Sequence, residues 1–481
     1  MPTPTIDTTA EQQILIDWLK NSDAEAAITY LSEIAYLDFE IIKKYYQKEN
    51  ATSWDVSWFP WNENIPWSIE LIDFLKDALD WDWFLGSQTL PWSIDFMEAF
   101  QDKLNLGYEY NAIYHNPKVP WSIELIERFA KQWNWKKLSA CEHIPWTYEL
   151  IDRFKRKWDW WALAENPSLP WSEELIERFE KEWNWEALSR NQALPLTAEM
   201  IERFKKKWKW TSFSSHSKIP WSPELLEKYI KKWNFRDDGY GAYDEDEREM
   251  LHQGLSTSRS LPWSIELIEK YKDQWDWYAL TENQALPWDT NYFKKFEAKF
   301  NEKIGERFTY YYGNLSSNKA VVWTEELIEK YQEQFYWNGS TGAGGEFSLS
   351  YNPSLPWSLA FINKYKDRWD WEWLTYNEGI YWTVELIERF ADYLDWGRIS
   401  CLRKFSWPVE FIEKHKDKFC REGLASNESL PWSMDFIKTY SDRLYIKCIR
   451  HNKAALAVLP QLSLEQVDDI MAHHFVRNNE A

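Results

Sequence analysis

Hydrophobic and polar positions along this chain recur with a period of 25 residues. The segment 144–170 reads IPWTYELIDRFKRKWDWWALAENPSLP, and the overlapping segment 169–195 reads LPWSEELIERFEKEWNWEALSRNQALP. Self-similarity at a fixed period is typical of repeat architectures, in which every copy is one small supersecondary unit. We number each unit from the tryptophan of its PWS-like motif, which is called position 1.

Fifteen such units follow one another between residue 37 and about residue 450. Most of them begin 25 residues after the previous unit, and the others begin after 25 residues plus an insertion. Position 1 is occupied in turn by Leu37, Trp67, Trp92, Trp121, Trp146, Trp171, Leu196, Trp221, Trp263, Trp288, Trp323, Trp357, Trp382, Trp407 and Trp432.

Within a unit, the residue types predict one longer helix and one short helix. Position 2 is Ser, Thr or Asp in 14 of the 15 units, with Pro408 as the exception, and such side chains cap helix N-termini. Apolar residues at positions 5, 6, 9 and 13 share one helical face, so we expect the first helix over positions 3–13. The spacing of positions 15 and 18 predicts a short second helix, and Asn at position 21 suits its C-cap or a turn.

A unit of this size is not stable alone, but stacked units would bury one continuous core. We therefore predict an all-α fold, an elongated and curved α-solenoid of about 15 tandem 25-residue repeats, each with one α-helix and one short α- or 3₁₀-helix. Residues 37–450 form the repeats, residues 1–36 an N-terminal helical cap, and residues 451–481 a C-terminal helical cap that includes a helix from about Leu462. Insertions interrupt the repeats near 105–117, 234–260, 300–318 and 336–352.

Tryptophan is unusually frequent, with 36 copies, and 29 of these occupy positions 1, 13 or 15. Because these positions face the predicted core or the start of a helix, we interpret them as structural rather than as stacking surfaces for sugars or bases. The tryptophans outside these positions are better candidates for exposed contacts: Trp18, Trp54, Trp58, Trp61, Trp83, Trp161 and Trp373.

Charge and cysteine content are typical of a soluble intracellular protein. The net charge of −21 favours solubility and disfavours general binding to nucleic acid or anionic membranes. The four cysteines lie far apart in the sequence without a CxxC pair, which fits a reducing compartment and gives no zinc motif. The chain begins without a secretory signal and has no run of 18 apolar residues, so we expect a cytoplasmic location and no membrane partner.

Position 11 points away from the apolar face, and its charge changes sign along the chain. It is basic in five successive units and acidic in most of the flanking units, and further bases lie beside it. The resulting candidate stripe for an anion or a partner consists of Lys131, Arg156, Lys181, Lys206, Lys231, Lys155, Lys157, Lys205 and Lys207.

Two interpretations of this stripe are open. Position 7 is acidic in the same five units, and acid–base pairs at i,i+4, such as Glu177 with Lys181, stabilise a solvated helix surface. In that case the bases are neutralised within their own helices. In the units with an acid at position 11, a Lys or Arg at position 8 could pair with that acid at i,i+3 instead. Alternatively, stacking aligns the charges into a ridge that suits an acidic protein or a short nucleic-acid segment.

The insertions are the second candidate for partner binding, because function on repeat proteins concentrates where the regularity breaks. Tyrosine is common in recognition surfaces, although these side chains could also pack the insertions back onto the repeats. The candidates are Tyr108, Tyr110, Tyr114, Tyr240, Tyr243, Tyr310, Tyr311 and Tyr312.

No motif predicts catalysis, a cofactor or a metal. The chain contains no HExxH, GxSxG, P-loop or dinucleotide-binding motif. The acidic run 244–249 lacks EF-hand spacing. Asp469 and His473 are one helical turn apart beside His474, but near the C-terminal end we interpret them as surface or capping residues.

We therefore expect a non-catalytic intracellular recognition or scaffold protein. It would bind another macromolecule, in the first place a protein, through the solenoid surface and the tyrosine-rich insertions. The first alternative is binding of an anion or a nucleic acid through the basic stripe of repeats 121–235. The second alternative is an acidic inhibitor that competes with nucleic acid for a nucleic-acid-binding partner.

Overall fold

The structure is a computed structural model that describes residues 9–46, 56–108, 110–235, 254–300, 315–338 and 348–480. Across these ranges the secondary structure is entirely helical, without a β-strand, as the repeat pattern predicts. The chain divides into two compact units. The first unit contains Met1–Asn134 and Trp382–Ala481, and the second contains Trp135–Tyr381.

Each repeat begins with a helix that its position-2 side chain caps. In 14 of the 15 repeats this side chain accepts a hydrogen bond from the N–H group three residues later, and only Pro408 does not. The first helices are α3 (Phe39–Tyr45), α4 (Ile69–Leu75), α6 (Ile94–Ala99), α7 (Ile123–Arg128), α9 (Tyr148–Arg153), α11 (Glu173–Arg178), α13 (Ala198–Arg203), α15 (Pro223–Lys228), α16 (Ile265–Lys270), α18 (Thr290–Phe300), α20 (Glu325–Tyr331), α21 (Leu359–Lys364), α23 (Val384–Arg389), α25 (Val409–His415) and α27 (Met434–Tyr440).

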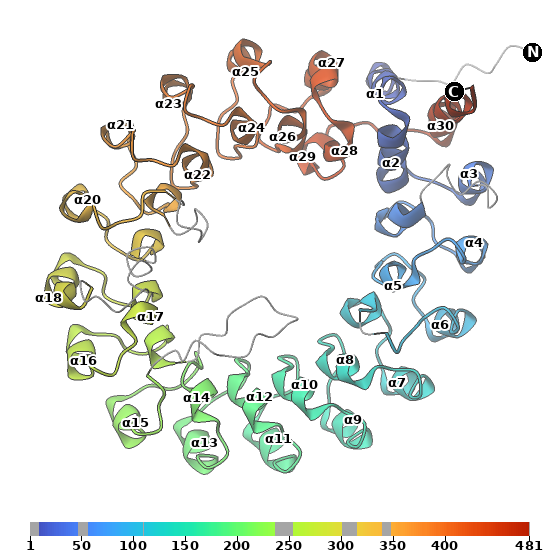
Figure 1. The fold of residues 1–481 in the computed structure, drawn as a ribbon. Helices are drawn as coiled ribbons and strands as arrows, with labels where there is room; N and C mark the ends of the chain where they lie inside the picture. The colour runs from blue at the N-terminus through green and yellow to red at the C-terminus, as the bar shows by residue number, and fades with distance from the viewer. Residues whose placement is uncertain are drawn as a thin grey trace, which may run out of the picture. The chain divides into compact units, whose positions relative to one another are not determined.

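The second part of each repeat is a shorter helix. Figure 1 shows that in the second unit the first helices form one row and the second helices, such as α10 and α12, lie side by side in another. The described second helices are η1 (Val56–Trp61), α5 (Trp81–Phe84), η2 (Ala112–His115), α8 (Trp135–Ala140), α10 (Trp160–Glu165), α12 (Trp185–Arg190), α14 (Trp210–Phe213), η3 (Leu255–Thr257), α17 (Trp277–Glu282), η6 (Leu349–Tyr351), α22 (Trp371–Thr375), α24 (Trp396–Ile399), α26 (Arg421–Ser426) and α28 (Ile446–Ile449).

Most first helices are shorter than the predicted span over positions 3–13, and in five repeats an indole takes one of the helix carbonyls. In α9, the Trp158 Nε1–H at position 13 donates to the Ile151 carbonyl at 3.1 Å. The Lys155 N–H, which would bond Ile151 in a continuing α-helix, donates to Asp152 instead. The same indole bond recurs at Trp133, Trp233, Trp275 and Trp369, and tight turns follow position 8.

The prediction that the repeat tryptophans are structural is confirmed. None of the 29 side chains at positions 1, 13 and 15 is exposed, and all seven at position 13 are buried. Most indoles at positions 1 and 15 donate to the carbonyl five residues earlier, as Trp171 does to Asn166 and Trp185 to Glu180. The indoles therefore fill the core and also satisfy backbone carbonyls that would otherwise lack a donor.

In most repeats a buried asparagine at position 21 links the repeat to the one before it. The Asn166 Nδ2 group donates to the carbonyls of Ser139 at 2.9 Å and Cys141 at 3.2 Å, and Oδ1 accepts from the Ser168 N–H. The predicted C-cap role is therefore correct, but the bonds to the preceding repeat were not predicted. Equivalent bonds to two carbonyls are made by Asn62, Asn116, Asn191, Asn283, Asn352, Asn377 and Asn427.

One repeat uses histidine for the same purpose. His216 is fully buried at position 21, its Nε2 lies 2.8 Å from the Asn191 carbonyl, and its Nδ1 accepts from the Lys218 N–H. This arrangement is that of a neutral imidazole with a proton on Nε2. Burial is the main reason why the pKa of His216 falls to about 4, and the ring therefore stays neutral at physiological pH.

The two ends of the chain meet within the first unit. The predicted N-terminal helices are α1 (Ala10–Asn21) and α2 (Ala24–Ile34), and the predicted C-terminal helix is α30 (Leu464–Glu480), preceded by η7 (Ser441–Arg443) and α29 (Lys453–Leu456). We expected these segments to cap opposite ends of an elongated array. That placement is wrong, because α1 packs on α27 and α30, and α2 on α28 and α30 (Figure 1).

Ion pairs join these terminal segments, and one of them is buried. Arg450 contacts Glu33 at 2.5 Å, and the two side chains are only 16% and 7% exposed. Partly exposed pairs surround it, namely Lys20–Asp469, Lys44–Asp468 and Lys447–Glu25. Burial raises the pKa of Glu33, and the Arg450 charge partly opposes that shift.

Loss of one inter-repeat asparagine should be costly. Asn166→Ala leaves the Ser139 carbonyl without its side-chain donor and removes one of the two side-chain donors to the Cys141 carbonyl, which should lower the free energy of unfolding by about 1 to 3 kcal/mol. Urea denaturation followed by circular dichroism measures this change. The control Gln274→Ala removes an exposed amide and should change stability by less than about 0.5 kcal/mol. Equal effects of the two variants would contradict the proposed role of Asn166.

The buried terminal ion pair predicts a pH-dependent defect. Arg450→Met leaves Glu33 buried without its partner and should destabilise the first unit by about 3 kcal/mol at pH 7. A carboxyl whose folded pKa is raised stabilises the fold in its protonated form, and that contribution is lost as pH rises through the folded pKa. The defect should therefore shrink at pH 4.5, where Glu33 takes up a proton.

Two further variants control this experiment. The double variant Glu33→Gln/Arg450→Met should recover most of the stability at pH 7, because no charge is then left buried. Arg443→Met breaks the exposed pair with Asp417 and should cost less than about 1 kcal/mol. A defect of Arg450→Met that is the same at both pH values would show that Glu33 is not its cause.

Candidate interaction surfaces

The basic residues at position 11 are exposed and lie beyond the helix that precedes them. In the second unit these residues are Arg156, Lys181, Lys206 and Lys231, which we call the basic row. No ion pair joins any of them to a described residue. Lys131, the fifth residue of the predicted stripe, is also exposed but belongs to the first unit.

The predicted i,i+4 pairs between positions 7 and 11 are therefore wrong. Each first helix here ends at position 8, so position 11 is not one α-helical turn beyond position 7. The position-7 acids pair with the position-8 base of the next repeat instead, as Asp152 does with Arg178 and Glu202 with Lys228. A ladder of ion pairs between neighbouring helices consumes the acids that were expected to neutralise the basic row.

Hydrogen bonds from tyrosines strengthen this ladder. The Tyr229 hydroxyl at position 9 donates to Glu202, which Lys205 and Lys228 also contact. Hydrogen bonds from Lys205, Lys228 and Tyr229 lower the pKa of Glu202 to about 2. This carboxylate stays ionised over the physiological range and is already occupied by three partners.

The other bases of the predicted stripe have structural partners. Lys155 pairs with Glu182 at 2.9 Å and Lys207 with Glu180 at 3.2 Å, both across neighbouring repeats, and Lys205 contacts Glu202. The Lys157 ammonium lies 5.0 Å from the Trp135 ring centroid. The position-11 residues are therefore the members of the predicted stripe that remain available to contact a partner.

In four of the flanking repeats, the acid at position 11 pairs with the position-12 base of the following repeat. Asp77 contacts Lys103 at 3.0 Å, Asp417 contacts Arg443 at 2.6 Å, and Glu333 contacts Arg368. The acidic and basic versions of position 11 therefore differ in more than sign. Where the residue is acidic it can join two repeats, and where it is basic its charge faces solvent.

The predicted tyrosine candidates separate into three groups. Tyr108 and Tyr110 are exposed, by 42% and 69%, and their rings contact each other with centroids 5.7 Å apart. Tyr114 is buried, accepts a hydrogen bond from the Asn134 N–H and donates to the Leu106 carbonyl, so its predicted role in partner binding is wrong. The remaining candidates lie outside the described residues: Tyr240, Tyr243, Tyr310, Tyr311 and Tyr312.

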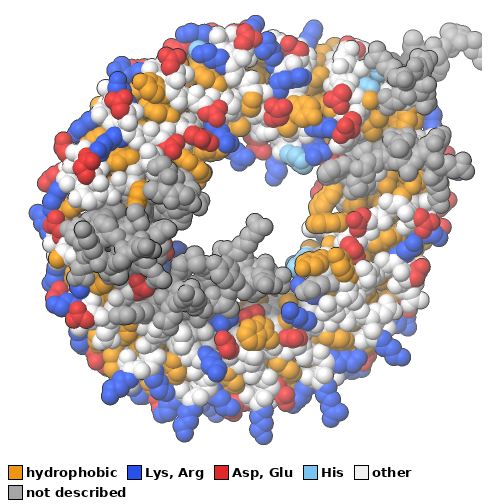
Figure 2. All heavy atoms as spheres, in the orientation of Figure 1, with side chains coloured by type: hydrophobic (Ala, Val, Ile, Leu, Met, Phe, Trp, Pro, Cys, Tyr) orange, Lys and Arg blue, Asp and Glu red, His pale blue; other side chains and the backbone are white. Residues whose placement is uncertain are grey.

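Two tryptophans add to this exposed aromatic surface in the first unit. Trp61, at the end of η1, is 59% exposed, and Trp83, in α5, is 65% exposed. Tyr108 and Tyr110 lie in the insertion before η2, and this insertion contacts α5 through the Asn105–Asp82 side-chain hydrogen bond. We call Trp61, Trp83, Tyr108 and Tyr110 the aromatic row. Figure 2 shows hydrophobic side chains gathered in the region where Figure 1 places these short helices.

The other non-repeat tryptophans differ in exposure. Trp161 is 39% exposed, Trp373 is half-buried, and Trp18 is buried at 6% exposure. The side chains of Trp54 and Trp58 lie outside the described residues. A tryptophan outside the repeat positions was therefore a useful sign of an exposed indole, since none of the 29 tryptophans at repeat positions is exposed.

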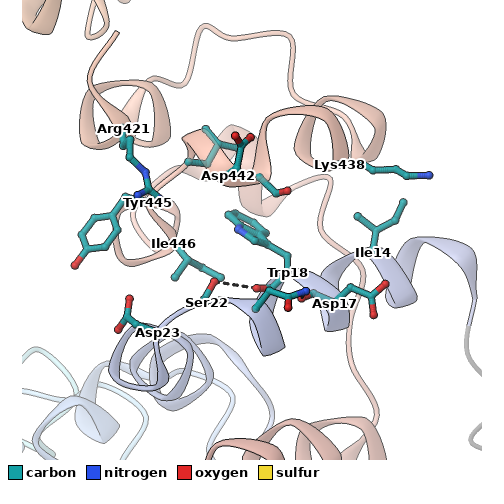
Figure 3. A pocket seen from close by; sticks show the side chains of 13 residues that line it. Ile14, Asp17, Trp18, Ser22, Asp23, Arg421, Lys438, Asp442, Tyr445 and Ile446 are labelled. Carbon is teal, nitrogen blue, oxygen red and sulfur yellow. Dashed lines mark hydrogen bonds between the residues drawn. The ribbon is translucent and has the colours of Figure 1, made fainter. Parts of the chain in front are cut away.

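A cavity of about 550 Å³ lies beside the contact between the terminal segments. In Figure 3, Trp18 of α1 faces α27 and α28, and Ser22 Oγ donates to the Trp18 carbonyl at 2.9 Å. Charged groups of both signs surround the opening, including Asp17, Arg421 and Lys438. The lining therefore favours neither an anion nor a cation. Trp18, which we predicted as a candidate for an exposed contact, lines the cavity as a buried side chain.

Histidines and cysteines serve the fold in ways that the sequence did not reveal. Asp469 pairs with Lys20 and His474 Nε2 lies 3.0 Å from the Leu19 carbonyl, so both belong to the terminal contact. Cys401 and Cys420, which are 19 positions apart, both place Sγ 3.6 Å from the Gly397 carbonyl oxygen. In the part of the chain that is described, no group of three or more His, Cys, Asp or Glu side chains is arranged to hold a metal ion.

None of the described helices combines the length and apolar character needed to cross a bilayer. Comparison with protein-family models, characterised protein sequences and solved structures finds no match for this chain. The proposals below therefore depend on the surfaces alone.

The aromatic row should be dispensable for stability. Trp83→Ala, at a 65% exposed side chain, should change the free energy of unfolding by less than about 0.5 kcal/mol. Trp183→Ala, at a side chain that is 4% exposed, should cost about 3 to 5 kcal/mol because it leaves a cavity. Chemical denaturation measures both values. A large loss for Trp83→Ala would assign this residue to the fold rather than to a surface.

Proposed function

We propose that this chain is a non-catalytic α-solenoid recognition protein that binds an extended segment of another protein on the aromatic row. The observation that carries this proposal is the exposure of Trp61, Trp83, Tyr108 and Tyr110 in a chain in which each of the 29 repeat tryptophans is buried or half-buried.

Exposed aromatic side chains at neighbouring sites are a feature of protein-binding surfaces. Tryptophan and tyrosine are enriched among the residues that carry most of the binding energy, because they bury a large area with few rotatable bonds. Isolated exposed apolar residues are normal, but exposed aromatics in three successive repeats support an interaction site. Because these four residues lie outside the core, the fold itself gives no reason for them.

The form of the row favours an extended segment over a globular partner. The residues belong to three successive repeats, and packed helices lie about 8 to 10 Å apart. An extended chain covers this distance with about three residues, so one segment could present an apolar side chain to each repeat. Aromatic surfaces of this kind recognise extended, proline-containing segments in several unrelated domains.

The charge around the row supports a protein rather than a nucleic acid. Asp82 is next to Trp83, and Glu63 is exposed two residues after Trp61. These carboxylates would repel phosphate groups, as would the net charge of −21. They would attract a lysine or arginine in the bound segment, so we expect this segment to carry at least one basic residue.

Site-specific crosslinking tests the proposal because it captures whichever molecule contacts the labelled position. A benzophenone amino acid replaces Tyr110 in the full chain expressed in its native cells, and mass spectrometry identifies the crosslinked peptides. The matched control places the same group at Tyr393, which is 47% exposed and outside the row. The proposal expects one protein segment to be crosslinked at position 110 only, and Trp61→Ser/Trp83→Ser in the same chain to abolish the product.

The identified segment then allows a quantitative measurement. As a synthetic peptide it should bind the purified chain, and Trp83→Ala should weaken binding by at least about tenfold, as expected for a binding hot spot. Crosslinking to nucleic acid, equal products at both positions, or binding that Trp83→Ala does not change would each overturn the proposal.

A further inference from the structure

The basic row is a second surface whose geometry the core does not explain. Arg156, Lys181, Lys206 and Lys231 recur every 25 residues on the same side of four successive repeats. Figure 2 shows Lys and Arg side chains projecting along the edge of the molecule where Figure 1 places α9, α11 and α13. All four residues belong to the second unit and are independent of the aromatic row.

We propose that the basic row binds an extended acidic segment of a protein that carries a carboxylate at every third residue. First helices of neighbouring repeats are expected to be about 8 to 10 Å apart. A polyproline II chain rises about 3.1 Å per residue and has three residues per turn, so its equivalent side chains recur about every 9.3 Å. One carboxylate per turn therefore meets one base per repeat without strain in either partner.

The neighbouring charges restrict what this row can bind. Glu149, Glu174, Glu199 and Glu224 are exposed at position 4, seven residues before each base. Position 4 lies in the first turn of each helix and position 11 in the turn after its end, so an acidic row runs parallel to the basic row. A single peptide strand contacts one row only, whereas a nucleic-acid duplex is wide enough to bring phosphates against the acidic row.

The charges between the two rows are already neutralised. Positions 7 and 8 form the ladder in which Arg178 contacts Asp152 and Lys228 contacts Glu202. Their bases cannot turn to a ligand without leaving a carboxylate unpaired. The position-11 bases have no such competing partner among the described residues, which is why the binding energy is assigned to them.

Three fluorescent probes distinguish binding of one carboxylate per repeat from general attraction between opposite charges. The first probe is a peptide of five Glu-Pro-Pro triplets. The second has the same composition with its five glutamates contiguous, and the third is a 15-nucleotide oligothymidylate. Fluorescence anisotropy with the full chain at low salt should give at least about fivefold tighter binding for the triplet peptide than for the contiguous peptide.

Charge reversal locates the site. Changing Arg156, Lys181, Lys206 and Lys231 to Glu should weaken binding of the triplet peptide by at least about thirtyfold, which corresponds to the loss of four exposed ion pairs. The control variant changes an equal number of exposed lysines outside the row in the same unit. These control residues are Lys136, Lys218, Lys319 and Lys366.

The control should reduce binding by less than about threefold, and both variants should retain the circular dichroism spectrum of the parent chain. Equal affinity for the two peptides, or equal losses in the two variants, would overturn the proposal in favour of unspecific electrostatics. Tighter binding of oligothymidylate that depends on the same four residues would overturn it in favour of nucleic acid. None of these outcomes affects the crosslinking test of the aromatic row.

Discussion

Backbone carbonyl groups that short helices leave without a donor are the main constraint on this structure. A six-residue helix satisfies few of its own carbonyls, and a buried carbonyl without a donor is costly. Here side chains supply the donors, since the Trp158 indole bonds Ile151 within its repeat and the Asn166 carboxamide bonds Ser139 and Cys141 of the previous repeat. Tryptophan and asparagine recur with the period of the repeat because each supplies an N–H group where the backbone cannot.

The same constraint determines where charges are free. Because the α-helix ends near position 8, the residue at position 11 lies in a tight turn and loses its i,i+4 neighbour. The acid at position 7 then finds its partner in the following repeat, as Asp152 does in Arg178. An arrangement that is required for the core therefore exposes a line of bases, although no single repeat contains an unusual residue.

Periodicity predicted those parts of the molecule that depend on local sequence. The serine caps, the buried repeat tryptophans and the helical character of every described element follow from residue types within one unit. The length of the first helix did not, because apolar spacing identifies the buried face but not the residue at which tight turns replace α-helical bonding. The error in the ion pairs follows directly from the error in helix length, since i,i+4 pairing assumes a continuous helix.

For the candidate surfaces, deviation from the period was more informative than composition. Trp61 and Trp83 are exposed and do not occupy repeat tryptophan positions, whereas Tyr114 was selected for its residue type and is buried. The Tyr114 hydroxyl donates to the Leu106 carbonyl and accepts from the Asn134 N–H. It therefore satisfies backbone groups that the 4-residue insertion near 105–117 exposes, which explains why this tyrosine is buried. An insertion into a chain of short helices creates new unpaired carbonyls, and some of its polar aromatics are needed for the fold.

The contact between the chain termini has a different physical basis from the contacts between repeats. Neighbouring repeats are joined by uncharged donors, aromatic packing and exposed ion pairs, whereas α2 and the end of α28 are joined by the buried pair of Arg450 with Glu33. A buried ion pair adds little net stability, but it disfavours every alternative packing of the terminal helices in which either buried charge lacks its partner. These residues are separated by more than 400 positions, so their contact can form only after the repeats between them have been synthesised. The first unit is therefore expected to be completed last during folding, and its buried charges would reject an incorrect pairing of the termini rather than drive their association.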